Sequence, residues 1–217
     1  MKLVSRLVVS SRPVSWINTA FPFAVAYYMT SEQVDANLLI GFIFFLIPYN
    51  LLMYGINDVF DYESDVANPR KGGIEGALLE PKYHLATLWI ASLLSAPFVV
   101  YLFAAGNQVS SLVLTGTLFA VVAYSVKYLR FKEIPVLDSF TSAVHFVGPL
   151  VFGLFLANHG SLETPLVIAS AAFLLGAWPL THLGQFKTLE LTGRQTSHQL
   201  RPFLAQGQPC DWHLPHT

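Results

Sequence analysis

The sequence predicts an all-α protein, a polytopic bundle of transmembrane helices. Three observations lead to this fold class. Hydrophobic residues make up 53% of the 217 residues and charged residues 12%, which is about half the share of charge in a typical soluble domain. The apolar residues form long segments, and about 20 of them suffice to cross a bilayer. The basic residues are confined to every second connection between these segments.

Apolar segments follow one another along the chain near residues 13–30, 37–56, 84–105, 109–126, 136–157 and 165–178. The first five are long enough to span a membrane, whereas the last begins as a span and is not completed, so we expect five spans and a partial sixth. Prolines inside them are acceptable, because membrane helices tolerate proline where neighbours satisfy the freed carbonyls. Ahead of these segments, "MKLVSRLVVSSRP" separates basic from apolar residues and predicts a short helix on the membrane surface.

The distribution of charge indicates how the segments are oriented. The connections "TSEQVDA", "AGNQVS" and "NHGSLET" contain neither Lys nor Arg. Every basic residue before position 178 lies before the first segment, between the second and third, or between the fourth and fifth. Because Lys and Arg mark cytoplasmic connections, we expect an integral protein of the cell membrane, in contact with membrane lipid, whose N-terminus is cytoplasmic.

The stretch "YGINDVFDYESDVANPRKGG", residues 54–73, follows the second segment and is dense in acids. If the helix of that segment continues into it, Asp58, Asp61 and Asp65 fall at i, i+3 and i+7 on one face. Asn57 joins the edge of this face. Carboxylates that close repel one another, which costs stability unless a cation neutralises them.

Magnesium is the cation that best suits this acidic stretch. Mg²⁺ binds carboxylate and amide oxygens and completes its coordination with waters and substrate phosphates. A metal that bridges the acids to a diphosphate also accounts for the bases that follow, Arg70 and Lys71. The alternative is a solvated juxtamembrane loop, which explains the acids but not their helical spacing. We expect the active site at this cytoplasmic boundary.

Groups that can donate to a phosphate also gather in "AYSVKYLRFKEIPVLD", residues 123–138: Tyr124, Ser125, Lys127, Arg130 and Lys132. Ordinary flanking charge at a membrane boundary explains the same bases when they are taken alone. Asp138 begins the fifth segment and is expected to face a cavity. His145 lies in mid-segment and is expected to be a hydrogen-bonded packing residue.

The sequence lacks the motifs that are typical of several functional classes. The net charge of −1 and the absence of a basic patch with interleaved aromatics argue against a nucleic-acid partner. The single cysteine, Cys210, excludes an internal disulfide framework. The sequence contains neither a Ser/His/Asp set, nor a Cys/His metal site, nor a glycine-rich phosphate loop.

The motifs themselves resemble a known family. "NDVFDYESD" is similar to the N-D-x-x-D-x-x-x-D motif of the UbiA superfamily of intramembrane prenyltransferases, and "YSVKYLRFKEIPVLD" resembles that family's segment between the fourth and fifth helices. "SSRPVSWINTAFPFAVAY" resembles its N-terminal opening. The wider text looks most similar to the lycopene elongase branch. The resemblance covers roughly residues 5–175, so we expect residues 1–175 to be the N-terminal part of a UbiA-type domain.

The resemblance implies a membrane prenyltransferase that moves an allylic prenyl group from its diphosphate, such as dimethylallyl diphosphate, to a lipophilic acceptor such as lycopene. It implies Mg²⁺ as the cofactor and a central cavity. The resemblance assigns metal binding to Asn57, Asp58, Asp61 and Asp65, catalysis to Asp58, Asp61 and Tyr124, and diphosphate binding to Arg70, Lys71, Lys127 and Arg130. Charge on the departing diphosphate is then met by metal and fixed bases.

The family resemblance ends near residue 175. Family members carry nine helices and a second aspartate motif, D-x-x-x-D, whereas residues 176–217 hold only Glu190 and Asp211 as acids and show no periodicity. Permitted codons for this tail, regrouped in another frame, encode a text that contains D-x-x-x-D. We therefore expect residues 176–217 to be an out-of-frame tail, and the chain as printed to be inactive through truncation.

Two other functions remain open at this point. A prenyltransferase with an aromatic acceptor, as in quinone synthesis, shares the same donor chemistry. A small membrane transporter or scaffold, with the acids as an ion path, is the non-enzymatic alternative. Acids in mid-span are expected of an ion path, whereas these lie at a cytoplasmic boundary.

Overall fold

The computed structural model describes residues 3–66 and 78–158, together with positions 164, 167, 168, 170–172 and 175. Every regular element in these residues is helical. The α-helices are α1 (Leu3–Ser10), α2 (Ile17–Ser31), α3 (Ala36–Leu46), α4 (Pro48–Phe60), α5 (Tyr62–Val66), α6 (His84–Ala105), α7 (Gln108–Ser125) and α8 (Pro135–Ala157). Single turns of 3₁₀-helix, η1 (Pro13–Ser15), η2 (Pro81–Tyr83) and η3 (Phe131–Glu133), precede α2, α6 and α8. The predicted all-α fold class is confirmed.

The predicted spans agree closely with the later helices. Helices α6, α7 and α8 begin and end within one residue of the predicted segments. Within the described residues, 4 helical stretches are long and apolar enough to cross a membrane, with α3 and α4 together forming one of them. The first predicted span is shorter than expected, because α2 has only 15 residues. The N-terminal part of this span is taken by η1, which follows Arg12 in a left-handed conformation with φ of 51°. Most of 165–178 and all of 176–217 lie outside the described residues.

The second predicted span is divided into two helices at Ile47. Pro48 begins α4 and has no N–H to donate, so carbonyls at the end of α3 lose their helical partners. The side-chain amide of Asn50 donates to the carbonyls of Phe45 at 2.7 Å and Leu46 at 3.1 Å. The hydroxyl of Thr19 in α2 also donates to the Phe45 carbonyl at 2.7 Å. Buried polar side chains therefore stabilise the break, as membrane proteins require at a proline.

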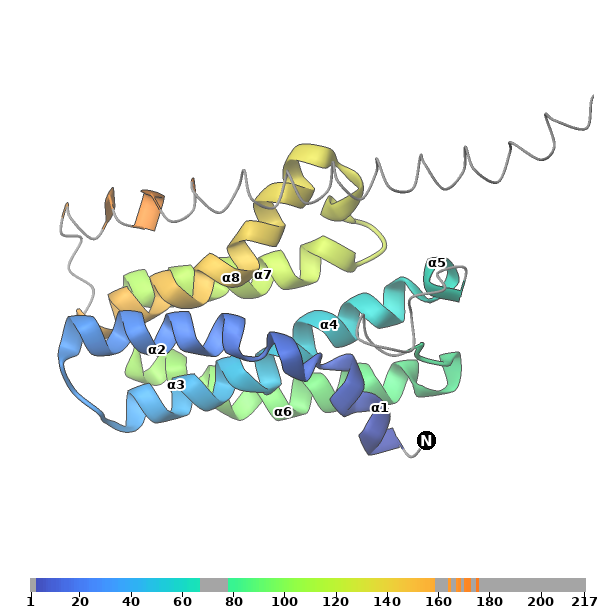
Figure 1. Cartoon of the computed structure of the whole chain (residues 1–217), viewed down its shortest axis with the longest axis horizontal. Helices are drawn as coiled ribbons and strands as arrows, with labels where there is room; N and C mark the ends of the chain where they lie inside the picture. The colour runs from blue at the N-terminus through green and yellow to red at the C-terminus, as the bar shows by residue number, and fades with distance from the viewer. Residues whose placement is uncertain are drawn as a thin grey trace, which may run out of the picture. The chain divides into compact units, whose positions relative to one another are not determined.

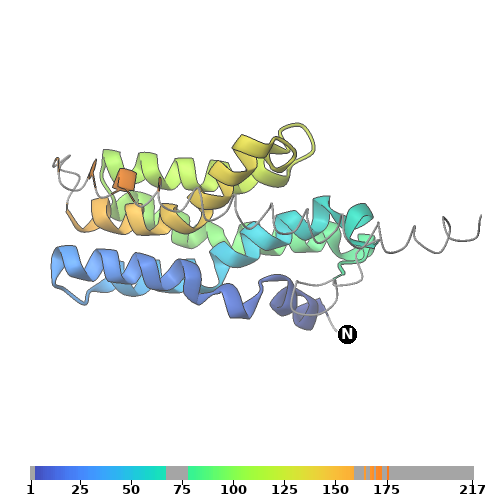
Figure 2. The same cartoon turned by 45° about the horizontal axis from the view of Figure 1, so that its top comes forward.

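Helix α8 packs along both α2 and α7, and α4 packs on α6 (Figure 1, Figure 2). The centre of the bundle is an aromatic cluster contributed by α2, α3, α4 and α8: Phe23, Phe44, Phe45, Tyr49 and Phe152. The ring centroids of Phe23 and Phe45 are 5.1 Å apart, and those of Phe45 and Tyr49 are 5.2 Å apart. This cluster fixes the N-terminal part of α4 relative to α8.

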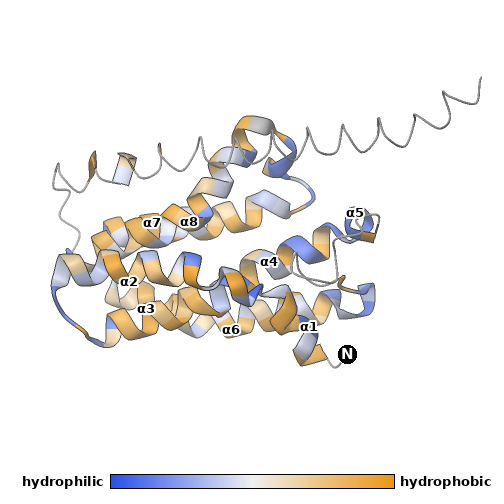
Figure 3. Cartoon of the chain, in the orientation of Figure 1, coloured by the Kyte–Doolittle hydropathy of each residue, from blue (hydrophilic) through white to orange (hydrophobic). Residues whose placement is uncertain are grey.

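The outer faces of the helices are apolar (Figure 3). Val100 in α6 is 68% exposed and Leu112 in α7 is 73% exposed. Exposed apolar surface of this kind is costly in water but not in lipid. Hydrophilic residues gather at the end of α4, in α5 and in the connection between α7 and α8 (Figure 3). Together with the apolar helices, this pattern identifies an integral membrane protein.

Gly153 allows the closest approach between α8 and α2. A Cβ at this position would lie 2.7 Å from the backbone carbonyl oxygen of Phe23. Small residues at such crossings let membrane helices pack closely. The side chain of Phe23 fills the adjacent core, so the backbone of α2 has no room to retreat.

We expect Gly153→Ala to lower the free energy of unfolding by about 1–3 kcal/mol, because the added methyl group overpacks this crossing. Thermal unfolding in detergent micelles, followed by circular dichroism, measures the change. Gly116→Ala is the matched control, since a Cβ there meets nothing within 4 Å. Equal stability of the two variants would contradict the packing described for α2 and α8.

Candidate active site

The aspartate motif lies where α4 ends and α5 begins. Asn57 and Asp58 belong to the last turn of α4. Asp61 follows the helix with φ of −102° and ψ of 3°, and its N–H donates to the Asn57 carbonyl at 2.9 Å. Asp65 lies in the short helix α5. The helix of the second span thus continues past residue 56, as the motif required, but is interrupted at Asp61.

Asp58 is held by the segment that precedes α2. Its carboxylate has 0% exposure. The hydroxyl of Ser10 donates to Oδ2 at 2.7 Å, and Nη2 of Arg12 lies 3.7 Å from Oδ1. The Arg12 guanidinium also lies 4.2 Å from the centre of the Tyr54 ring. The sequence analysis assigned no site role to Ser10 or Arg12, although both lie in the "SSRP" stretch that resembles the family's opening.

Helix α1 is itself anchored to the start of α6. Arg6 donates to the Leu78 carbonyl at 3.0 Å and to the Glu80 carboxylate at 2.5 Å, and Lys82 lies 2.6 Å from the same carboxylate. The hydrogen bond from Lys82 and the charge of Arg6 lower the pKa of Glu80. The predicted helix at the N-terminus is confirmed, and these contacts place it against the bundle.

Asp61 is paired with the connection between α7 and α8. Lys132 in η3 forms an ion pair and hydrogen bond with its carboxylate, and Nη2 of Arg130 lies 3.8 Å from Oδ1. Arg130 also pairs with Glu133 at 2.6 Å. Lys132 was noted in the sequence but not included among the site residues. Lys127 was included, yet it is exposed and forms no ion pair with a described residue.

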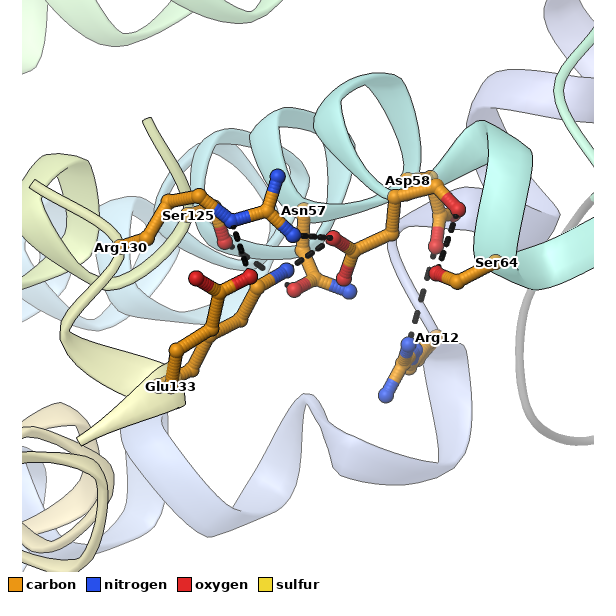
Figure 4. Close-up of polar contacts among 9 residues, drawn as sticks. Arg12, Asn57, Asp58, Ser64, Ser125, Arg130 and Glu133 are labelled. Atoms are coloured by element: carbon orange, nitrogen blue, oxygen red, sulfur yellow. Dashed lines mark hydrogen bonds and ion pairs between the residues drawn. The ribbon is translucent and has the colours of Figure 1, made fainter. Parts of the chain in front are cut away.

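The shared metal-binding role of Asp58, Asp61 and Asp65 stays a prediction. No group of three or more His, Cys, Asp or Glu side chains in them is arranged to hold a metal ion. Asp58 pairs with Arg12 (Figure 4) and accepts a hydrogen bond from Ser10. Asp61 pairs with Lys132. The interruption of the helix at Asp61 and the mutual repulsion of the carboxylates explain the separation, because each acid finds its own basic partner.

A cavity of about 230 Å³ lies beside this end of α4. Its lining residues are Arg12, Met53, Tyr54, Asn57, Tyr124, Ser142, His145 and Phe146. The Asn57 side-chain oxygen accepts a hydrogen bond of 3.0 Å from Ser125 (Figure 4). The Tyr124 hydroxyl is hydrogen-bonded with Asp138. The structure thus brings Asn57 and Tyr124 to one cavity, and Arg12, which also lines it, pairs with Asp58.

His145 differs in part from its expected role. It is only 4% exposed, and its ring packs edge-on against Tyr124 with centroids 5.1 Å apart. Its Nε2 nevertheless has no hydrogen-bond partner among the described residues. Arg70 and Lys71, both expected at the site, lie outside the described residues.

Comparison with known proteins gives relatives for this chain. It is similar to the C(50) beta-cyclic carotenoids biosynthesis protein LbtBC of Dietzia sp. (strain CQ4), at 59% identity over 156 residues, which are 72% of this chain and 36% of the relative. It is also similar to a lycopene elongase/hydratase of Corynebacterium glutamicum, at 46% identity over 176 residues, which are 81% of this chain and 61% of the relative. The chain therefore spans between 36% and 61% of the length of these relatives.

A solved structure shares the fold. A UbiA homolog from Archaeoglobus fulgidus, bound to DMAPP and Mg²⁺, has a TM-score of 0.62 and 24% identity, covering 79% of this chain and 60% of that one. The family model described as the UbiA prenyltransferase family matches residues 19–195, a range that includes the aspartate motif and reaches past residue 175. This match covers most of the chain, and the chain belongs to the UbiA prenyltransferase family.

Proposed function

We propose that this protein is a membrane prenyltransferase that moves an allylic prenyl group from its diphosphate to a carotenoid of the lycopene type. The names of its relatives, which include lycopene elongase/hydratase, support this acceptor. DMAPP, which is dimethylallyl diphosphate, was bound to the homolog that shares the fold, which supports the donor. The observation that carries the proposal is the cavity itself, because Asn57, Tyr124 and Arg12 line it at the end of α4.

The residues present fit Mg²⁺ in the donor chemistry they offer. Asn57, Asp58, Asp61 and Asp65 supply hard oxygen atoms at the end of α4 and in α5. The carboxylates of Asp58 and Asp61 are separate, so the protein offers part of a coordination shell and not a closed cage. Mg²⁺ commonly takes a few protein oxygens and completes its shell with waters and phosphate oxygens. When bound, the metal supplies positive charge to the diphosphate as it leaves.

Bases from several segments are available to the same leaving group. Arg130 and Lys132 already lie at Asp61, and both can turn to a diphosphate that replaces the carboxylate as their partner. Guanidinium groups suit phosphate because they donate two parallel hydrogen bonds. We include Lys127, Arg70 and Lys71 in this set as proposals from the family motif. Tyr124 presents its ring to the cavity, next to the carbon that becomes cationic.

The acceptor has a route from the lipid. A more open groove of about 480 Å³ is lined by residues of α2 and by Phe146 of α8. Phe146 also lines the cavity beside Asn57. The apolar groove and the polar cavity therefore adjoin at this side chain. We propose that an apolar polyene enters along α2 and presents its end to the cavity at Phe146.

The tail stays a proposal of its own. Its sequence lies outside the described residues, and the match to the family model extends to residue 195. We propose that residues 176–217 include residues translated out of frame. We also propose that the 217-residue chain transfers prenyl groups far more slowly than a chain with the frame restored after Leu175. The nucleotide sequence around codon 175 tests this interpretation: an uninterrupted frame shared with the relatives would refute it.

We expect Asp61→Ala to reduce prenyl transfer by about 100-fold or more, because it removes an oxygen ligand and the partner that positions Arg130 and Lys132. The assay measures transfer from labelled dimethylallyl diphosphate to lycopene, with Mg²⁺, in membranes that contain the frame-restored chain.

Glu63→Gln is the matched control for this measurement. Glu63 is an exposed acid at a variable position of the motif, so its removal should leave the rate within about twofold. Near-normal, Mg²⁺-dependent turnover of Asp61→Ala would refute the assigned role of that carboxylate.

We propose that the aspartate motif faces the cytoplasm. Lys and Arg occur only in every second connection between the apolar segments, and such basic connections are usually cytoplasmic. Reporter fusions after residues 70 and 130 should therefore give a cytoplasmic signal. Fusions after residues 33, 107 and 160 should report the opposite side. Alkaline phosphatase and a fluorescent protein, each fused at all five positions, measure both outcomes. A cytoplasmic signal after residue 107 would reverse the proposed orientation.

A further inference from the structure

His145 occupies an unusual position for a buried titratable side chain. It lies in the middle of α8 and lines the same cavity as Asn57 and Tyr124. The hydroxyl of Tyr49 donates to the backbone carbonyl of His145 at 3.1 Å, which fixes this part of α8 to α4. The imidazole therefore lines the cavity about two helical turns beyond Asp138 along α8.

The hydrogen bonds of the ring determine its tautomer. The ring is hydrogen-bonded to the backbone of Ala120 in α7. Nε2 has no partner among the described residues, so Nδ1 makes this bond. A neutral imidazole has one N–H donor and one acceptor nitrogen. With Nδ1–H donating to a backbone carbonyl, Nε2 carries the lone pair and is the nitrogen that can accept a proton.

The proposed reaction creates a need for such a group. The C–O bond of the allylic diphosphate breaks and its electron pair leaves with the diphosphate. The allylic carbon then takes the π electrons of an acceptor double bond, which forms the new C–C bond and leaves a carbocation on the acceptor. Water can add to that carbon through its oxygen lone pair, provided that a base takes one of its protons. The products are an alcohol, diphosphate and one proton.

We propose that Nε2 of His145 holds the water that adds to the acceptor carbocation and accepts its proton. This inference rests on the proposed function. A buried acceptor nitrogen beside a polar cavity of this size is a favourable position for an ordered water. The cavity of about 230 Å³ also includes Ser142, whose hydroxyl offers a further hydrogen-bonding group. A single bound water can react with the carbocation on the acceptor, while the apolar helices keep bulk water away from the earlier allylic carbocation.

The other polar groups near the cavity are less suited to this role. The Tyr124 hydroxyl is engaged with Asp138, and Asp58 is held by Ser10 and Arg12. Asp61 is paired with Lys132. Among these neighbours, His145 combines a neutral ring with a nitrogen that has no hydrogen-bond partner among the described residues.

The first experiment does not depend on prenyl transfer. The full chain, labelled with ¹⁵N-histidine in detergent micelles, is compared with His145→Phe to assign the His145 signals by NMR. We expect a neutral ring with Nδ1 protonated and Nε2 unprotonated at pH 7. A proton on Nε2 would overturn the inference, because no lone pair would then be available to water.

The second experiment measures the product. His145→Phe keeps the ring shape but has no acceptor nitrogen, so the frame-restored chain should still consume dimethylallyl diphosphate. Its product from lycopene should change from alcohol to alkene, with the alcohol fraction reduced at least tenfold by mass spectrometry. Glu63→Gln, which changes an exposed acid that does not line the cavity, should keep the wild-type ratio.

The outcomes separate this inference from the proposed function. An unchanged alcohol fraction in His145→Phe would overturn the role of His145 while leaving prenyl transfer established. If the frame-restored chain with His145 intact gave a prenylated product without added water, the role of His145 would likewise be overturned. Absence of any prenylated carotenoid from the frame-restored chain with His145 intact would overturn the proposed function, and this inference with it.

Discussion

The site depends on one constraint, the complete burial of the Asp58 carboxylate at the end of α4. An ionised carboxylate is costly in a low-dielectric interior unless it is paired and hydrogen-bonded. Ser10 and Arg12 supply these contacts from the segment before α2. This requirement draws the N-terminal segment onto α4 and holds Arg12 in its left-handed conformation, stacked on Tyr54. As a result, a residue from the beginning of the chain forms part of the wall of the cavity.

The apolar part of the bundle sets where that carboxylate lies. The break at Ile47 redirects α4, and Asn50 and Thr19 satisfy the carbonyls that the proline releases. The aromatic cluster then joins this part of α4 to α2 and α8. Each of these contacts is buried, so a shift in one is transmitted to the others through a closely packed interior. The cavity beside Asn57 is a consequence of this packing, since its walls come from α4, α7, α8 and the segment before α2.

Acidic and basic side chains form ion pairs around Asp61, where α4 ends. Asp61 is paired with Lys132 and Arg130, and Arg130 is paired in turn with Glu133. These pairs are largely buried, with Lys132 14% and Asp61 13% exposed, so each charge needs a partner of opposite sign, which a metal ion or a diphosphate can also supply. They are therefore exchangeable: a cation can replace the bases at the carboxylate, and an anion can replace the carboxylate at the bases. Lys132 and Arg130, which now pair with Asp61, can bind a diphosphate, and Asp61 can bind a metal ion. His145 lies in the middle of α8, where it lines the cavity and can act on the uncharged acceptor.

The sequence by itself determined the all-α class, the bounds of α6, α7 and α8 and the position of the aspartate motif, because hydropathy and helical spacing are local properties. It did not determine the break at Ile47, since a proline in an apolar segment is compatible with a continuous helix until its neighbours are known. Only the tertiary structure decided that Ser10 and Arg12 meet Asp58, that Lys132 and not Lys127 meets Asp61, and that Nε2 of His145 is left with its lone pair. The physical reason is the same in each case. The packing of helices that are distant in sequence determines which groups a charged or polar side chain contacts, and a local motif does not specify that packing.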